Sequence, residues 1–256
     1  YFSAGMSNEP EVNQCFADAE KERKAFLHVM KNNLVLKSPD PVINTLFYFS
    51  KIRASESIFE TKMGLVHSPG GGNYYAGVWA NDQVEYSGPF FPWLGYGNAN
   101  IAAYNAYKHF LKNIPPKGEF IRSSFEMEGD LPCCSKDRGD AAMISYGTSQ
   151  FVLASGDKKI AEDLWPLIEW SIEYCNGNLN EHGVVISDTD EMEGRIPTGD
   201  ANLATSSLYY GGLINAVKVA RMLNKKPGVE KDLLHKAKRL EAAIDNYFGT
   251  TIDGIE

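Results

Sequence analysis

The chain of 256 residues lacks the features that define several common classes of protein. No apolar run reaches the roughly 18 residues that a membrane-spanning helix needs, and no signal peptide is visible. The run Gly70-Gly71-Gly72 is not followed by the Lys-Ser/Thr pair of a phosphate-binding loop, and no Gly-x-Ser-x-Gly nucleophile motif is present. Lys and Arg number 25 against 33 Asp and Glu, so we expect neither nucleic acid nor a membrane as a partner.

Cysteine is also scarce, at four residues: Cys15, Cys133, Cys134 and Cys175. None has a Cys-x-x-Cys or Cys/His spacing that suits zinc, so no metal and no cofactor is predicted. Cys133 and Cys134 could form a strained vicinal disulfide, but we interpret all four as free thiols because a chain this long does not need cross-links. The chain starts at Tyr1 rather than Met. We take this as a mature or trimmed form and expect a secreted or periplasmic location.

Apolar periodicity and capping residues predict a mainly helical chain. The expected helices cover 9–32, 40–59, 98–113, 139–155, 159–174, 203–223 and 229–248. Those over 40–59, 139–155 and 203–223 are apolar on most of their circumference, which predicts burial. Those over 159–174 and 229–248 are polar on one side. We therefore expect an all-α fold with an inner and an outer layer of helices, because the few short strands cannot form a doubly wound sheet.

The segment Tyr74–Tyr86 concentrates aromatic rings and acids within a stretch, 64–97, that we read as loop and short strand. A connection this long indicates function rather than simple linkage. Aromatic rings stack on sugar faces, and carboxylates bind hydroxyls or move protons. Asp82 and Glu85 would share one face if this segment is helical. Alternatively, these two carboxylates lie at a helix N-terminus, where the helix dipole favours negative charge.

A second acidic segment, Asp188–Arg195, precedes the predicted helix over 203–223 and carries four acids in six positions. Such acids repel each other, so burial would raise the pKa of at least one, as a general acid requires. The alternatives are a solvated loop and an adventitious calcium site, although the spacing of an EF-hand is absent. Both acidic segments precede buried helices, so we expect them to open on the same end of the fold.

Two further sequences resemble the six-hairpin glycosidase superfamily. Gly156–Ile168 reads Gly-Asp, then a helix with Trp165-Pro166-x-Ile168, and is similar to an outer-helix signature of that superfamily. Trp79–Glu85 resembles its Trp-x-x-Asp-x-x-Glu substrate loop, with Asn81 where an Arg is expected. The resemblance implies an (α/α)6 toroid of helical hairpins over residues 1–256. The chain is too short for twelve helices, so it is either a partial toroid or one whose remaining hairpins lie outside these residues.

The resemblance implies a glycoside hydrolase that acts on an oligosaccharide or glycoside, with inversion. Glu191 or Glu193 is the predicted general acid, while Asp82 and Glu85 hold hydroxyls or supply the partner carboxylate. The predicted substrate-binding residues are Tyr74, Tyr75, Trp79, Asn81, Trp93, Asp188, Asp190 and Arg195. One alternative is a non-catalytic carbohydrate-binding protein on the same fold. Another is a polysaccharide lyase, which would need a Tyr/His or Asn/His pair and a basic cleft.

Overall fold

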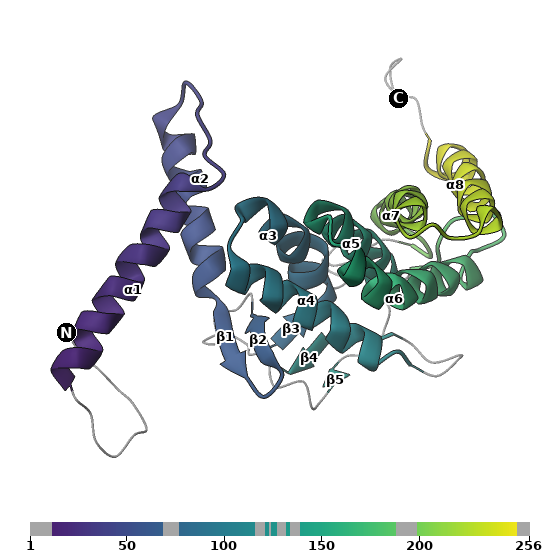
Figure 1. Cartoon of the computed structure of the whole chain (residues 1–256). Helices are drawn as coiled ribbons and strands as arrows, with labels where there is room; N and C mark the ends of the chain where they lie inside the picture. The colour runs from purple at the N-terminus through teal and green to yellow at the C-terminus, as the bar shows by residue number, and fades with distance from the viewer. Residues whose placement is uncertain are drawn as a thin grey trace.

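Helices dominate the computed structural model, which describes residues 12–68, 77–115, 121–122, 124–126, 132–133, 139–187 and 199–249 (Figure 1). Within these ranges the α-helices are α1 (Val12–Asn32), α2 (Pro41–Glu56), α3 (Gly88–Leu94), α4 (Gly97–Lys112), α5 (Asp140–Ser155), α6 (Lys158–Gly177), α7 (Leu203–Met222) and α8 (Pro227–Phe248). A π-helix, η1 (Ala80–Ser87), runs directly into α3. The prediction of an all-α fold class is confirmed at this level. No helix in the described ranges is long and apolar enough to cross a membrane.

Local sequence signals define the helical hairpins. Gly156 ends α5 in the left-handed conformation, at φ 65°, which glycine adopts without strain. Asp157 then caps α6 by accepting hydrogen bonds from the backbone N–H groups of Lys159 and Ile160. Asn202 caps α7 in the same way, because its side chain accepts a hydrogen bond from the backbone N–H of Thr205. Because a two-residue turn joins α5 to α6, these two helices run antiparallel.

The predicted layering holds for the last four helices. In α5, 11 of 16 residues are buried, against 8 of 20 in α6, so the helix predicted to be inner is the more buried one. In α7 there are 10 buried residues of 20, whereas α8 has 3 of 22. The core therefore lies around α5 and α7, with α6 and α8 covering it (Figure 1).

Close approaches between glycines and neighbouring side chains give the relative direction of the inner helices. A Cβ on Gly139, just before α5, would lie 2.6 Å from Thr205 Oγ1, and a Cβ on Gly212 would lie 2.3 Å from Ser145 Oγ. Both α5 and α7 therefore advance in the same direction. In the outer layer, Lys225 lies over the ring of Trp165, and Lys236 Nζ lies 2.7 Å from Glu173 Oε1. These contacts make α6 and α8 parallel as well.

A third hairpin, formed by η1–α3 and α4, packs beside this pair. Tyr107 on α4 donates a hydrogen bond to the carbonyl oxygen of Val84 at 2.9 Å, and its hydroxyl lies 3.2 Å from the Gly147 carbonyl oxygen. The tight turn at Gly95 makes η1–α3 and α4 antiparallel. The hydroxyl of Tyr104 donates to Asp163 at 2.6 Å. By these contacts η1–α3 lies beside the inner helix α5, and α4 lies beside the outer helix α6. Burial alone does not separate this hairpin into two layers, because 7 of 16 residues are buried in α4 against 6 of 15 in η1–α3.

Two small antiparallel sheets flank these hairpins. The strands β1 (Ile58–Thr61) and β2 (Gly64–His67) form a hairpin that follows α2. The strands β3 (Gly77–Trp79), β4 (Ser124–Glu126) and β5 (Pro132–Cys133) form a three-stranded sheet in the order β3-β4-β5. Trp79 pairs with Ser124 in this sheet, which fixes the start of η1. Ile121 and Arg122, which precede β4, form neither helix nor strand.

The prediction that the helix starting near Asp40 is an inner helix is wrong. Asp40 does cap α2 by accepting from the N–H of Val42, but only Lys51, Ile52 and Ser55 of this helix are buried. Val42 is 70% exposed and Leu46 is 64% exposed. The reason is that α1 and α2 form a hairpin that stands beside the other helices rather than among them (Figure 1). A wide apolar face on this helix therefore did not predict that the helix is buried.

Candidate functional site

The predicted substrate loop contains a π-helix rather than an irregular loop. Trp79 ends β3 in an extended conformation, and η1 begins at the next residue. The wide winding is visible where the N–H of Gly88 bonds to the carbonyl oxygen of Gln83, five residues earlier. Ala80, Gln83 and Val84 form its buried face. Short π-helical segments occur frequently at functional sites because they displace side chains from the positions that an α-helix would give.

The predicted residues Asn81, Asp82 and Glu85 all lie on η1 and are half-buried. Asp82 occupies the first turn, where the positive end of the helix dipole favours a negative charge. A π-helix places residue i beside i+4 and i+5 rather than i+3. Glu85 therefore lies on the same side of η1 as Asn81. Asp82 and Glu85 would share a face only if this segment were an α-helix.

A buried pair of side chains supports η1 from beneath. Nδ1 of His67, at the end of β2, lies 2.5 Å from Oε1 of Gln83. Burial lowers the pKa of His67 to about 4, which keeps the imidazole neutral at physiological pH. The ring of Phe91 meets His67 edge-on at 5.2 Å and fixes the imidazole from α3.

Backbone contact holds η1 against the middle of α5. A Cβ on Gly147 would lie 1.9 Å from the carbonyl oxygen of Val84 and 3.1 Å from Cα of Glu85. Only glycine permits this approach, since any side chain would overlap the η1 backbone. Tyr107 bonds to the same Val84 carbonyl from the outer layer. The positions of Asp82 and Glu85 thus depend directly on a glycine of the neighbouring inner helix.

The N-terminal ends of the inner helices lie at one end of the molecule. The contact between Gly139 and Thr205 places the start of α5 beside the start of α7. η1 runs parallel to α5, because α4 is antiparallel to η1–α3 and parallel to α6: Tyr104 contacts Asp163, and six residues further along α4 Phe110 lies near Leu167. Asp140, in the first turn of α5, is fully buried at this end. The sequence analysis did not predict this burial.

The described residues that flank the second acidic segment lie at the same end. Val185 donates its backbone N–H to Ser206 Oγ in the first turn of α7 at 3.1 Å. Ile186 forms a β-bridge with Ala201, and the N–H of Ser187 bonds to the carbonyl oxygen of Asp200 at 2.9 Å. Both described flanks of the segment therefore meet beside the N-terminus of α7. The predicted residues Asp188, Asp190, Glu191, Glu193 and Arg195 lie outside the described residues.

The predicted aromatic residues do not all gather at this end. Trp79 is half-buried at the start of η1, next to Asp82. Trp93 is 66% exposed near the C-terminal end of α3, whereas Trp79 precedes the N-terminal end of η1. The structure therefore separates Trp93 from Trp79. Tyr74 and Tyr75 lie outside the described residues.

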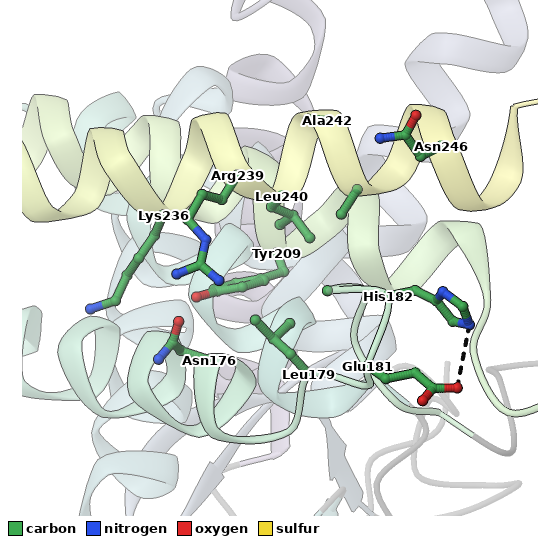
Figure 2. Close-up of a pocket in the computed structure, with 12 residues that line it drawn as sticks. Asn176, Leu179, Glu181, His182, Tyr209, Lys236, Arg239, Leu240, Ala242 and Asn246 are labelled. Atoms are coloured by element: carbon green, nitrogen blue, oxygen red, sulfur yellow. Dashed lines mark ion pairs between the residues drawn. The ribbon is translucent and has the colours of Figure 1, made fainter.

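A cavity that sequence reasoning did not identify lies between α6, α7 and α8 (Figure 2). Its volume is about 370 Å³, and its polar lining includes Tyr209 of α7, Lys236 and Arg239 of α8, and Asn176 of α6. These residues are far apart in sequence and no short motif joins them. Among the described residues, no group of three His, Cys, Asp or Glu side chains is arranged to hold a metal ion. Cys175 is buried and forms no disulfide, while the disulfide question at Cys133 and Cys134 concerns side chains outside the described set.

Comparison with known proteins adds no relative. No protein-family model matches the chain. A search of curated proteins likewise finds no match.

Proposed function

We propose that this chain is a glycoside hydrolase whose three hairpins are consecutive parts of an (α/α)6 toroid. The parallel inner elements η1–α3, α5 and α7, each followed by an antiparallel outer helix, support this architecture. A toroid is the arrangement in which such hairpins repeat around a ring. Its inner helices then begin at one common end, where their preceding loops form a substrate pocket.

One observation carries the functional proposal. Asp82, in the first turn of η1, lies at the same end of the inner helices as the described flanks of the acidic segment 188–195. The half-buried ring of Trp79 lies at this end too, directly before η1. Glycoside hydrolysis requires two carboxyl groups on opposite sides of the scissile bond, and an aromatic ring gives the sugar a stacking surface.

In the proposed reaction, a protonated carboxyl on Glu191 or Glu193 donates its proton to the leaving oxygen. A second carboxylate, on Asp82 or Glu85, accepts a proton from the water that attacks the anomeric carbon from the opposite face. Inversion requires room for that water, so the two carboxyl groups should lie roughly 6.5–9.5 Å apart, rather than about 5 Å as in retaining enzymes. Asn81 stands where the superfamily pattern has an Arg, so it binds sugar hydroxyls through a neutral amide.

The test is the release of reducing ends from a panel of oligosaccharides, with the anomer of the first product followed by NMR. We expect turnover of at least one substrate with inverted configuration. Asp82→Asn should reduce the rate by about 10²–10⁴-fold if Asp82 is the base. Asp245→Asn, which removes a carboxylate from α8, is the matched control and should retain wild-type activity.

Calorimetric titration with the same sugars separates the catalytic proposal from the carbohydrate-binding alternative. Saturable binding of a sugar that is never cleaved, with the affinity reduced by Asp82→Asn, would indicate a binding protein. Neither cleavage nor binding across the panel would contradict both assignments.

A further inference from the structure

A buried histidine joins η1 to two other elements of the fold. His67, at the end of β2, is 3% exposed, and its Nδ1 lies 2.5 Å from the side-chain amide oxygen of Gln83 on η1. The ring also has a backbone hydrogen-bond partner in Ala54, in the last turn of α2. Phe91 of α3 packs against the ring edge-on, with the two ring centroids 5.2 Å apart. One side chain therefore meets α2, η1 and α3 together.

Gln83 is the residue of η1 that this histidine holds. It is fully buried, and its own carbonyl oxygen accepts the hydrogen bond from Gly88 that forms the wide turn of η1. A buried carboxamide is costly unless it is hydrogen-bonded, whereas an apolar side chain of the same size would fill the position without that cost. A hydrogen bond, however, fixes direction as well as distance, and apolar contacts do not. The choice of a histidine and a glutamine at this contact therefore indicates that the orientation of η1 matters.

The anchored residues of η1 stand between its two carboxylates. Gln83 is held by His67, and the next residue, Val84, is held from α4 and α5. Asp82 precedes this pair in the sequence and Glu85 follows it, and both are half-buried. A shift or rotation of η1 at positions 83 and 84 would therefore move both carboxylates.

We propose that His67 is a positioning residue of the candidate site, which sets the orientation of η1 through its hydrogen bond with Gln83. That His67 holds η1 in place stands on the geometry, whereas the effect on catalysis rests on the proposed hydrolysis. A displacement of about 1 Å can reduce the rate of an enzyme about 10²-fold, even when it arises away from the reacting atoms. Because the carboxylates act in the transition state, we expect the loss in kcat rather than in KM.

A double substitution separates positioning from simple stabilisation. His67→Leu combined with Gln83→Met removes both polar partners of the hydrogen bond and keeps the core filled, so the urea midpoint should stay close to that of the wild type. We expect kcat for glycoside cleavage to fall by about 10- to 100-fold, with KM changed by less than about threefold. His67→Asn keeps an amide group near the position of Nδ1, where it can still bond to Gln83, so this variant should recover most of kcat.

Hydrogen exchange of backbone amides, followed by mass spectrometry, measures how firmly η1 is held without any substrate. In the double variant we expect the amides of residues 80–88 to exchange about tenfold faster or more, because a contact that resists the opening of η1 is lost. Peptides from α6 should exchange as in the wild type. Ser171→Ala is the matched control, since it removes a buried hydroxyl that bonds to Ile168 within α6, and it should leave both kcat and the exchange of η1 unchanged.

Wild-type exchange over η1 in the folded double variant would overturn the proposal, and so would wild-type kcat in that variant. If the double variant does not fold, Gln83→Met alone decides by the same two measurements, because it removes the same hydrogen bond. If the wild-type protein cleaves no glycoside, the proposed hydrolysis fails separately, and hydrogen exchange alone decides whether His67 holds η1.

Discussion

Replacing Gly147 by alanine tests how the inner helices position the candidate site. The new Cβ would lie 1.9 Å from the carbonyl oxygen of Val84 and 2.6 Å from its carbonyl carbon. Favourable contacts between such atoms occur at about 3.5–4.0 Å, so η1 and α5 must separate by more than 1 Å. Because the obstructing atoms belong to the backbone, no side-chain rotation relieves the overlap.

Two effects of opposite sign determine the stability of Gly147→Ala. Alanine favours a helix interior by about 1 kcal/mol over glycine, whereas overpacking a core costs about 1–3 kcal/mol and more when backbone has to move. We expect the overlap to dominate, with a net loss in the free energy of unfolding. For a chain of this size each kcal/mol lowers Tm by roughly 2–4 °C. Glycoside cleavage should fall too, because Val84 lies between Asp82 and Glu85 in sequence.

The assay is urea unfolding followed by far-UV circular dichroism, combined with the reducing-end assay. Gly228→Ala on α8 is the matched control, since a Cβ there has no atom within 4 Å. That variant should be neutral or more stable by up to about 1 kcal/mol. A Gly147→Ala protein with wild-type stability would refute the close packing of η1 on α5.

Three further perturbations probe other parts of the structure. His67 has a folded pKa of about 4 against 6.5 when unfolded, so the unfolded chain takes up a proton first as pH falls. The free energy of unfolding should therefore decrease between pH 6.5 and 4, by up to about 3 kcal/mol, and His67→Gln should flatten this part of the pH profile. Ile52→Ala should cost about 2–5 kcal/mol because Ile52 is buried, whereas Leu46→Ala on the same helix should cost under about 0.5 kcal/mol; equal costs would mean that the Leu46 face is covered in solution. Tyr107→Phe should cost about 1–3 kcal/mol in urea unfolding, because it leaves the buried Val84 carbonyl without its hydroxyl donor.

The helices of the second half could be predicted from sequence because local rules agree there with the tertiary structure. Asp157 and Asn202 are strong N-caps, and the apolar stripe of α6 has the period of an α-helix. Burial of α2 could not be predicted in the same way. Its apolar residues include Val42 and Leu46, and nothing in the periodicity says whether another element covers them.

The η1–α3 element was missed for a different reason. A π-helix lacks the 3.6-residue period, and Gly88-Pro89 reads as a turn although Pro89 fits the first turn of α3. The residue types of the candidate site were nevertheless visible in the sequence, because aromatic and acidic residues adjoin there. The burial of Asp140 and the cavity around Tyr209 were not visible, since both result from packing between helices that are distant in sequence.

The central claim, that a carboxyl of the acidic segment 188–195 protonates the leaving group, is tested most directly by Glu191→Gln and Glu193→Gln. Glutamine keeps the shape and hydrogen bonding of the side chain but cannot donate the proton. The account predicts that one of the two variants loses about 10²–10⁴-fold in rate on an unactivated glycoside, with a much smaller loss on an activated aryl glycoside and with sugar binding retained. Full activity of both variants on the unactivated substrate would contradict it.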